Sequence, residues 1–125
     1  MAELRARPTD AELAILHVLW DRGPSTVRQV FESLANRETG YTTTLKILQK
    51  MTDKGLVRRD ESSRSHVYEP VARAEPTQRL LVRELLQKAF GGSPGQLVMQ
   101  ALSEKKATAA ELADIRRLLD QLEKK

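Results

Sequence analysis

Residues 41–60 read YTTTLKILQKMTDKGLVRRD and combine an amphipathic helix with its stop signal and the start of a strand. Apolar residues recur at helical spacing along one side of this segment, namely Leu45, Leu48 and Met51. The spacing predicts a helix from Thr42 or Thr43 to Lys54, and Gly55 stands where a left-handed C-terminal cap belongs. The other side of the helix is polar and basic.

Positive charge is concentrated around this helix. The chain has 125 residues and a formal net charge of +4, which by itself is weak evidence for a polyanionic partner. Between residues 41 and 59, however, five basic residues stand against the single acid Asp53: Lys46, Lys50, Lys54, Arg58 and Arg59. Such a local concentration is typical of a face that binds nucleic acid.

The segments on either side of the helix complete a recognisable order of elements. Segments 56–60 and 66–70 alternate around a polar tip at 61–65, which predicts a β-hairpin. Two short helices are expected earlier: one from the capping box at Thr9 to about Asp21, and one capped by Ser25. Three helices followed by a hairpin with a basic tip indicate a winged helix-turn-helix, in which the hairpin is the wing.

The chain becomes helical again after the hairpin. Pro76 is expected in the first turn of a helix that Gly91-Gly92 ends, Pro94 begins a short helix, and a capping box at Thr108 begins the last one. Three helices with a single aromatic residue cannot bury much core alone, so their apolar stripes should meet a second copy of the chain. The expected dimerisation residues are Leu81, Leu85, Leu86, Leu97, Leu102, Leu112, Ile115, Leu119 and Leu122.

The predicted fold is therefore mainly α with a small β-hairpin. It consists of an N-terminal winged helix-turn-helix domain that binds DNA, at residues 1–72, and a C-terminal helical dimerisation domain, at residues 73–125.

The second helix of a helix-turn-helix enters the major groove with its N-terminal end leading, so side chains near that end are candidates for DNA contact. Threonines can meet phosphates or thymine methyl groups, and Lys46 can reach guanine acceptors. The expected DNA-binding residues are Ser25, Arg28, Tyr41, Thr42, Thr43, Thr44, Lys46, Lys50 and Arg64. The alternative is structural: the threonines only cap the helix, the lysines lie on a solvated surface, and Arg64 is a loop residue exposed to water.

Catalytic and metal chemistry find little support. The chain has no cysteine, and His17 and His66 lack neighbouring ligands at zinc spacing, so no enzyme, metal or cofactor is expected. No apolar run reaches the roughly 18 residues that a membrane span requires, so no membrane insertion and a cytoplasmic location are expected.

Specific motifs resemble the penicillinase-repressor family, also called the BlaI/MecI/CopY family. The resemblance rests on residues 19–27 (LWDRGPSTV), 41–51 (YTTTLKILQKM), 54–57 (KGLV), 68–70 (YEP), and the region from Phe90-Gly91-Gly92 to Leu122. It implies a cytoplasmic, homodimeric winged-helix repressor that binds a pseudo-palindromic operator in double-stranded DNA.

The resemblance also implies a mode of induction. In β-lactam-responsive members, a membrane sensor metallopeptidase system leads to a cut at an Asn-Phe bond in the dimerisation region. The matching pair in this chain is Gln100-Ala101, which departs from that pattern. The cysteine cluster of the copper-responsive branch is absent, so copper sensing by that route is excluded.

The leading hypothesis from the sequence is a homodimeric, sequence-specific transcriptional repressor, with relief by proteolysis in the dimerisation region. The alternative is a winged-helix module that binds a protein partner and never touches DNA. A small-molecule sensor would need an apolar pocket that no motif marks, and a hydrolase ranks last.

Overall fold

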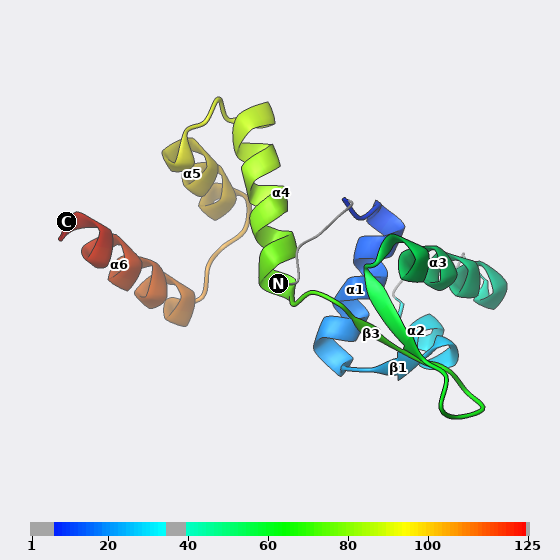
Figure 1. Ribbon diagram of the computed structural model, residues 1–125. Coiled ribbons are helices and arrows are strands. Elements are labelled where there is room, and N and C mark those ends of the chain that lie inside the picture. Colours follow the sequence, from blue (N-terminus) through cyan, green and yellow to red (C-terminus); the bar gives the residue numbers. More distant parts are fainter. Residues whose placement is uncertain (1–6, 35–39, 125) are drawn as a thin grey trace. The chain divides into compact units, whose positions relative to one another are not determined.

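The computed structural model describes residues 7–34 and 40–124, which form six helices and three short strands (Figure 1). The fold is mainly α with a small antiparallel sheet, as predicted. The elements are α1 (Asp10–Arg22), β1 (Ser25–Thr26), α2 (Val27–Ser33), α3 (Tyr41–Lys54), β2 (Val57–Asp60), β3 (Val67–Pro70), α4 (Ala74–Ala89), α5 (Pro94–Glu104) and α6 (Ala109–Glu123). The chain divides into two units, residues 1–81 and 82–125, so the division falls inside α4 and after the boundary expected at residue 72.

Helix α1 begins and ends as the sequence predicts. The Thr9 side chain accepts a hydrogen bond from the Glu12 backbone N–H at 3.2 Å, and the Glu12 carboxylate accepts one from the Thr9 N–H at 2.9 Å. This reciprocal pair is a capping box, which satisfies two backbone donors that the first turn would otherwise leave unpaired. Gly23, with φ of 90°, ends the helix in a conformation that other residues rarely adopt.

The expectation that Ser25 caps the second helix is wrong. The cap of α2 is Thr26, whose side chain accepts from the Gln29 N–H at 3.2 Å, while the Gln29 side chain accepts from the Thr26 N–H at 2.9 Å. The physical reason is that a capping box needs Glu or Gln three residues after the cap, and only Thr26 has one. Ser25 instead lies in strand β1.

Strand β1 adds a third strand that the sequence analysis did not expect. The sheet order is β1-β3-β2, with both pairs antiparallel. Tyr68 in β3 is the partner of Ser25 on one side and of Arg59 on the other. The wing, defined here as residues 57–70, is therefore tied to the start of α2 through its returning strand.

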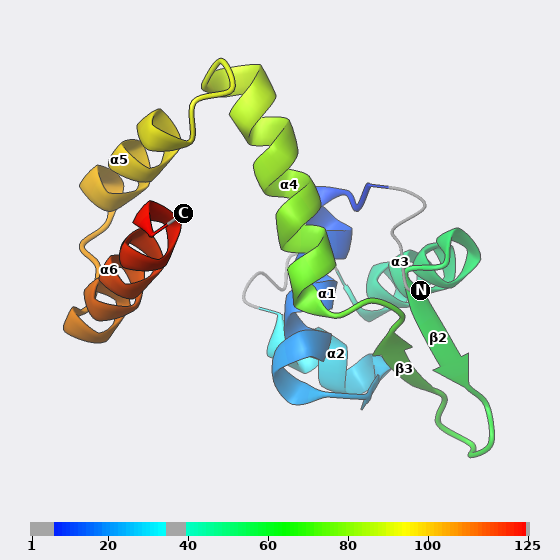
Figure 2. The same cartoon turned by 60° about the vertical axis from the view of Figure 1, so that its left-hand side comes forward.

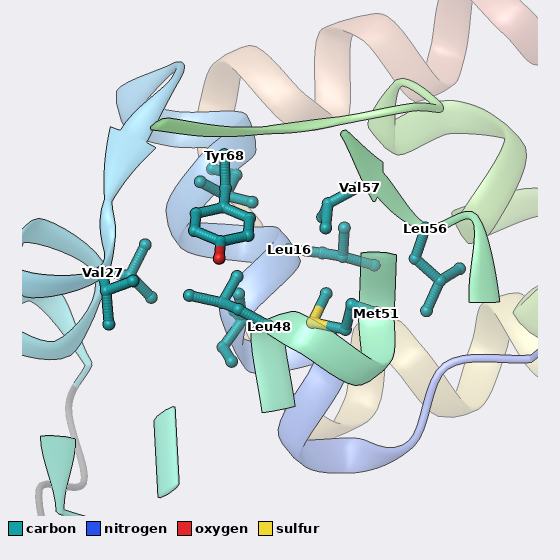
Figure 3. Packing of buried hydrophobic residues seen from close by; sticks show 10 residues of the cluster. Leu16, Val27, Leu48, Met51, Leu56, Val57 and Tyr68 are labelled. Atoms are coloured by element: carbon teal, nitrogen blue, oxygen red, sulfur yellow. The ribbon is translucent and has the colours of Figure 1, made fainter. Parts of the chain in front are cut away.

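The core of the first unit lies between the three N-terminal helices and the sheet (Figure 3). Its buried apolar residues come from all of these elements: Ile15, Leu16, Leu19, Val27, Val30, Leu48, Met51, Leu56, Val57 and Tyr68. Figure 3 shows the Tyr68 ring directed from β3 into this cluster, with Leu48 of α3 close to its hydroxyl end. The Tyr68 side chain also hydrogen bonds with Arg59, whose pKa is raised by that contact, so the phenol is not buried without a polar partner.

Helix α3 presents its apolar side to this core. Leu48 and Met51 are fully buried, and Leu45 and Ile47 are half-buried against the cluster. The helix begins at Tyr41, slightly earlier than predicted, and Gly55 closes it in the left-handed conformation (φ 80°, ψ 17°), as predicted.

The second unit is helical and contains no buried side chain in α5 or α6. Gly91 and Gly92, both with positive φ, end the α4 segment, as the sequence predicts. The Ser93 side chain caps α5, and Thr108 caps α6 with a complete capping box. The three C-terminal helices can be followed in Figure 2.

An ion pair joins the end of α3 to the start of α1. The Lys54 ammonium at the end of α3 lies 2.7 Å from the Glu12 carboxylate at the start of α1, and Glu12 is 5% exposed. Burial alone would raise the pKa of the Glu12 carboxyl, but the hydrogen bonds from Lys54 and Thr9 outweigh it and hold the pKa below its ordinary value of 4.5. A carboxyl with a lowered pKa stabilises the fold above its unfolded-state pKa, and that contribution is lost as the pH falls through the folded value.

We expect Glu12→Gln to lower the free energy of unfolding by about 1–2 kcal/mol at pH 7, because glutamine keeps the cap to Thr9 but loses the charge that faces Lys54. The difference between the two proteins should shrink between pH 7 and about pH 3, because the folded carboxyl gains its proton only below 4.5. Urea unfolding at both pH values measures it, with the exposed Glu75→Gln as the control. A difference that is independent of pH would contradict the assignment.

Candidate nucleic-acid interface

The exposed side of α3 is polar and carries free cations. Its outer face, as the term is used below, consists of Thr42, Thr43, Lys46, Gln49 and Lys50, all of which are exposed. Within residues 7–34 and 40–124, neither Lys46 nor Lys50 takes part in an ion pair. Because the opposite side of the helix packs on the core, this face is rigidly presented to solvent.

Two of the residues expected to contact DNA, Thr44 and Ser25, have buried side chains. Thr44 is 0% exposed, and its hydroxyl donates to the Gly40 carbonyl at 3.2 Å inside the helix. Ser25 is 1% exposed, and its hydroxyl donates to the Gly23 carbonyl at 2.9 Å. Both hydroxyls therefore have partners inside the fold.

Lys54, which the sequence places on the same stripe as Lys46 and Lys50, has a structural partner instead. Its ammonium binds the buried Glu12, and the side chain is 32% exposed. The free positive charge of α3 therefore lies in its first three turns, toward the end that leads into a groove in helix-turn-helix proteins.

Tyr41, the first residue of α3, contacts two side chains of α2. The Arg28 guanidinium carbon is 5.2 Å from the centre of the Tyr41 ring, and the Phe31 ring meets the same ring edge-on at 6.1 Å. Arg28 and Phe31 are one helical turn apart, so they share a face of α2. A cation–π contact of this kind contributes about 0.5–1 kcal/mol at an exposed site.

Most cations of the wing are paired within it, and one is not. Arg59 binds Glu61 at 2.9 Å, and Arg58 lies 3.4 Å from Glu69. The loop that carries Arg64 is held by its own hydrogen bonds, because the Ser63 hydroxyl donates to the Ser65 carbonyl at 2.8 Å. Arg64 has no ion-pair partner in the described part of the chain, and Figure 1 shows its loop projecting beyond the sheet.

A hollow of about 390 Å³ brings several of these groups together. This wing hollow, as we name it, is lined by Thr26 and Arg28 of α2 and its cap, Tyr41 of α3, and Arg64, Ser65 and His66 of the wing. The sequence predicted Arg28, Tyr41 and Arg64 as DNA contacts, and the structure places all three on this one hollow. It missed His66, since only the hairpin turn brings residue 66 next to α2.

Gln49 was also missed, although its signal was available. It lies three residues after Lys46 and therefore on the same side of α3. A glutamine amide can form two hydrogen bonds with adenine, so its chemistry fits a groove.

The expected dimerisation residues lie in α4, α5 and α6, and none of them is buried in the single chain. Leu85, Leu102, Leu119 and Leu122 are exposed, and the other five are half-buried. Gln100 and Ala101 are both exposed in the middle of α5.

A metal site and a membrane-spanning helix each have requirements that the described residues do not meet. No cluster of three or more histidine or acidic side chains is arranged to hold a metal ion there. No described helix is long and apolar enough to cross a bilayer.

The comparison with known families matches residues 8–121 to the penicillinase repressor family. This chain belongs to that family. It is 38% identical to the transcriptional regulator BlaI of Mycobacterium tuberculosis, in both strain CDC 1551 / Oshkosh and strain H37Rv, over an alignment that covers 98% of this chain and 89% of BlaI. As a family member the chain is a BlaI-like transcriptional regulator and DNA-binding repressor, and not an enzyme, which confirms those predictions.

A solved structure agrees on the fold of this penicillinase-repressor family member. The structure is that of Bacillus licheniformis BlaI, in its monomeric form in complex with the blaP half-operator. It covers 61% of this chain and 93% of that one, with a TM-score of 0.50 and 23% sequence identity. This likeness supports the winged-helix fold class predicted from the sequence.

Neighbouring threonines provide a matched test of the two sides of α3. We expect Thr43→Ala to weaken DNA binding while changing the free energy of unfolding by less than about 0.5 kcal/mol, because its side chain is exposed. Thr44→Ala should destabilise the fold by about 1–2 kcal/mol, because it removes a buried methyl group and a hydrogen bond, and should leave the affinity of the folded protein unchanged. Urea unfolding and fluorescence anisotropy measure the two effects. Equal losses of affinity in both variants would contradict the division.

Proposed function

We propose that this protein acts as a homodimer on a pseudo-palindromic operator, each copy reading one half-site with the outer face of α3. The observation that carries the proposal is the outer face itself. Lys46 and Lys50 are exposed and form no ion pair within residues 7–34 and 40–124, and Gln49 and two threonine hydroxyls lie beside them on a helix whose other side packs on the core. These are the chemical groups that read base edges and hold phosphates in a major groove.

The dimer is proposed from the apolar surface of the C-terminal helices. Val82, Leu85, Val98, Met99, Leu118, Leu119 and Leu122 are all 45% exposed or more. Within α6, the residues Leu112, Ile115, Leu119 and Leu122 recur at spacings of three and four, which is the pattern of a seam against another helix. Large apolar surfaces of this kind are uncommon on monomers, and a second copy of the chain would cover them.

Symmetry then sets the form of the operator. A two-fold dimer presents two α3 helices, so the half-sites should lie on one face of the duplex, about one helical turn or a multiple of it apart. The half-operator complex of the Bacillus licheniformis relative supports one half-site for each copy. Occupancy of the operator would block RNA polymerase, and the proposal places the protein in the cytoplasm, because a bacterial-type repressor acts where the chromosome lies.

The family resemblance adds two further parts to the proposal. Repression is relieved by proteolysis at Gln100-Ala101, and a membrane sensor metallopeptidase system triggers the cut. Both side chains are exposed, but the bond lies inside α5. A peptidase that needs extended substrate must therefore unwind this part of α5 before it can cut. Electrophoresis of the protein from induced cells would reveal the fragments 1–100 and 101–125.

Fluorescence anisotropy tests operator binding directly. The probes are duplexes of about three helical turns, tiled over the DNA upstream of the coding sequence, with scrambled duplexes of equal composition as controls. We expect one duplex to bind about a thousandfold or more tightly than its scrambled control, with a steep dependence on salt. Equal weak binding to all duplexes would contradict the proposal and favour a module that binds a protein partner.

The two lysines of the outer face should differ in their effects. Lys46 lies nearer the leading end of α3, so we expect Lys46→Ala to weaken binding to the operator more than to the scrambled duplex. Lys50→Ala should weaken both alike and reduce the salt slope by about one unit. The exposed Lys106→Ala, outside α3, is the control. Unchanged binding in both α3 variants would remove this face from the interface.

The dimer seam is tested by Leu119→Asp, which places a charge among apolar residues of α6. We expect this variant to be a monomer at micromolar concentration, because an unpaired charge buried in an interface is costly. Gln121→Asp, an exposed position on the other side of the same helix, should stay a dimer. Sedimentation velocity measures both. A dimer that survives Leu119→Asp would take Leu119 out of the interface.

A further inference from the structure

The wing hollow carries positive charge that no residue of the described chain neutralises. Arg28 and Arg64 line it from opposite elements, and neither takes part in an ion pair within residues 7–34 and 40–124. The described residues that line it include no carboxylate. Of the acids of the wing, Glu61 and Glu69 are engaged by Arg59 and Arg58, and Asp60 accepts a hydrogen bond from the Ser62 N–H at 2.9 Å.

Arg28 is held in place before any ligand arrives. Its guanidinium stacks on the Tyr41 ring at 5.2 Å, and the Phe31 ring meets that tyrosine ring edge-on at 6.1 Å. A stacked guanidinium keeps its N–H donors in the plane of the group, so they stay available to an anion. Tyr41 is thus a positioning residue for Arg28.

The lining also contains hydrogen-bond donors, beside the apolar side chains of Val27 and Leu45. His66 and Ser65 come from the wing, and the Tyr41 side chain ends in a phenolic hydroxyl. Two cations and several neutral donors, with no acid among the described lining residues, suit a compact oxyanion, which presents only acceptors. They suit a base edge less well, because a base edge also presents donors, and these would need acceptors in the protein.

We propose that the wing hollow holds one phosphate group of the DNA backbone, bound by Arg28 and Arg64 together, with His66 as a further donor. This inference rests on the proposed operator binding and deepens it. It separates two tasks within one interface: the outer face of α3 meets the groove, and the hollow between α2, α3 and the wing fixes the protein to one strand at a defined register. Binding in the hollow is then independent of base sequence.

A phosphate scan on the operator duplex tests the inference. In each duplex of the series, a single phosphate is replaced by the uncharged methylphosphonate, and the affinities of wild type, Arg28→Ala, Arg64→Ala and Lys50→Ala are measured by anisotropy. We expect one position at which neutralisation weakens wild type roughly tenfold but costs Arg28→Ala and Arg64→Ala almost nothing further. Lys50→Ala should still lose roughly tenfold at that position, since it contacts a different phosphate.

The outcomes separate this inference from the proposed function. Wild-type protein without operator preference overturns the proposed function. If the operator is preferred but the scan couples Arg28 and Arg64 to different phosphates, or to no phosphate, only the phosphate site in the wing hollow is overturned. Replacing chloride by inorganic phosphate at equal ionic strength should leave duplex affinity unchanged, and a marked loss would show that free phosphate occupies the hollow instead.

The role of Tyr41 is tested by two substitutions that differ in one property. Tyr41→Phe keeps the aromatic ring under Arg28 and should retain the coupling between Arg28 and its phosphate. Tyr41→Leu removes the ring. The coupling free energy between Arg28 and its phosphate should then fall by at least half, while the loss of affinity caused by Lys46→Ala stays the same. Full coupling in Tyr41→Leu would overturn the positioning role.

Discussion

The N-terminal unit depends on the double pairing of Tyr68. Its backbone joins β1 at Ser25 and β2 at Arg59, and its ring fills the space between α1, α2 and α3. The pairing with β1 places the start of α2, and therefore Arg28, beside the wing. The pairing with β2 sets the register of the hairpin, and therefore which residues stand at its tip. Removing this side chain would disturb both sides of the DNA-binding surface at once, as well as the core.

The position of each α3 residue around the helix axis decides whether its side chain packs in the core or faces solvent. Thr43 and Thr44 are chemically identical and adjacent, yet a rotation of about 100° per residue exposes one and buries the other. The same geometry sends Lys54 to Glu12 while Lys46 and Lys50 stay free. One cation of the stripe thus ties α3 to α1, and the proposed DNA contacts fall to the other two.

The two units differ in how much hydrophobic core a single chain gives them. The first has a closed core with capped helices and a paired sheet, whereas α5 and α6 bury no side chain within one copy. Helices without a core of their own need a partner surface, which is why the proposed dimer is as much a requirement of stability as of operator symmetry.

Local sequence signals determined most of the elements: the capping boxes at Thr9 and Thr108, the glycine cap at Gly55 and the alternation of the wing all correspond to the structure, because each depends on residues within one or two turns. The family and its DNA-binding role were also accessible from motifs. Only the tertiary structure decided that Ser25 belongs to a third strand, that Lys54 serves Glu12, and that Arg28, Tyr41, Arg64 and His66 share one hollow. These facts join residues up to 43 positions apart, and no local pattern encodes which distant partner a side chain meets once the core has closed.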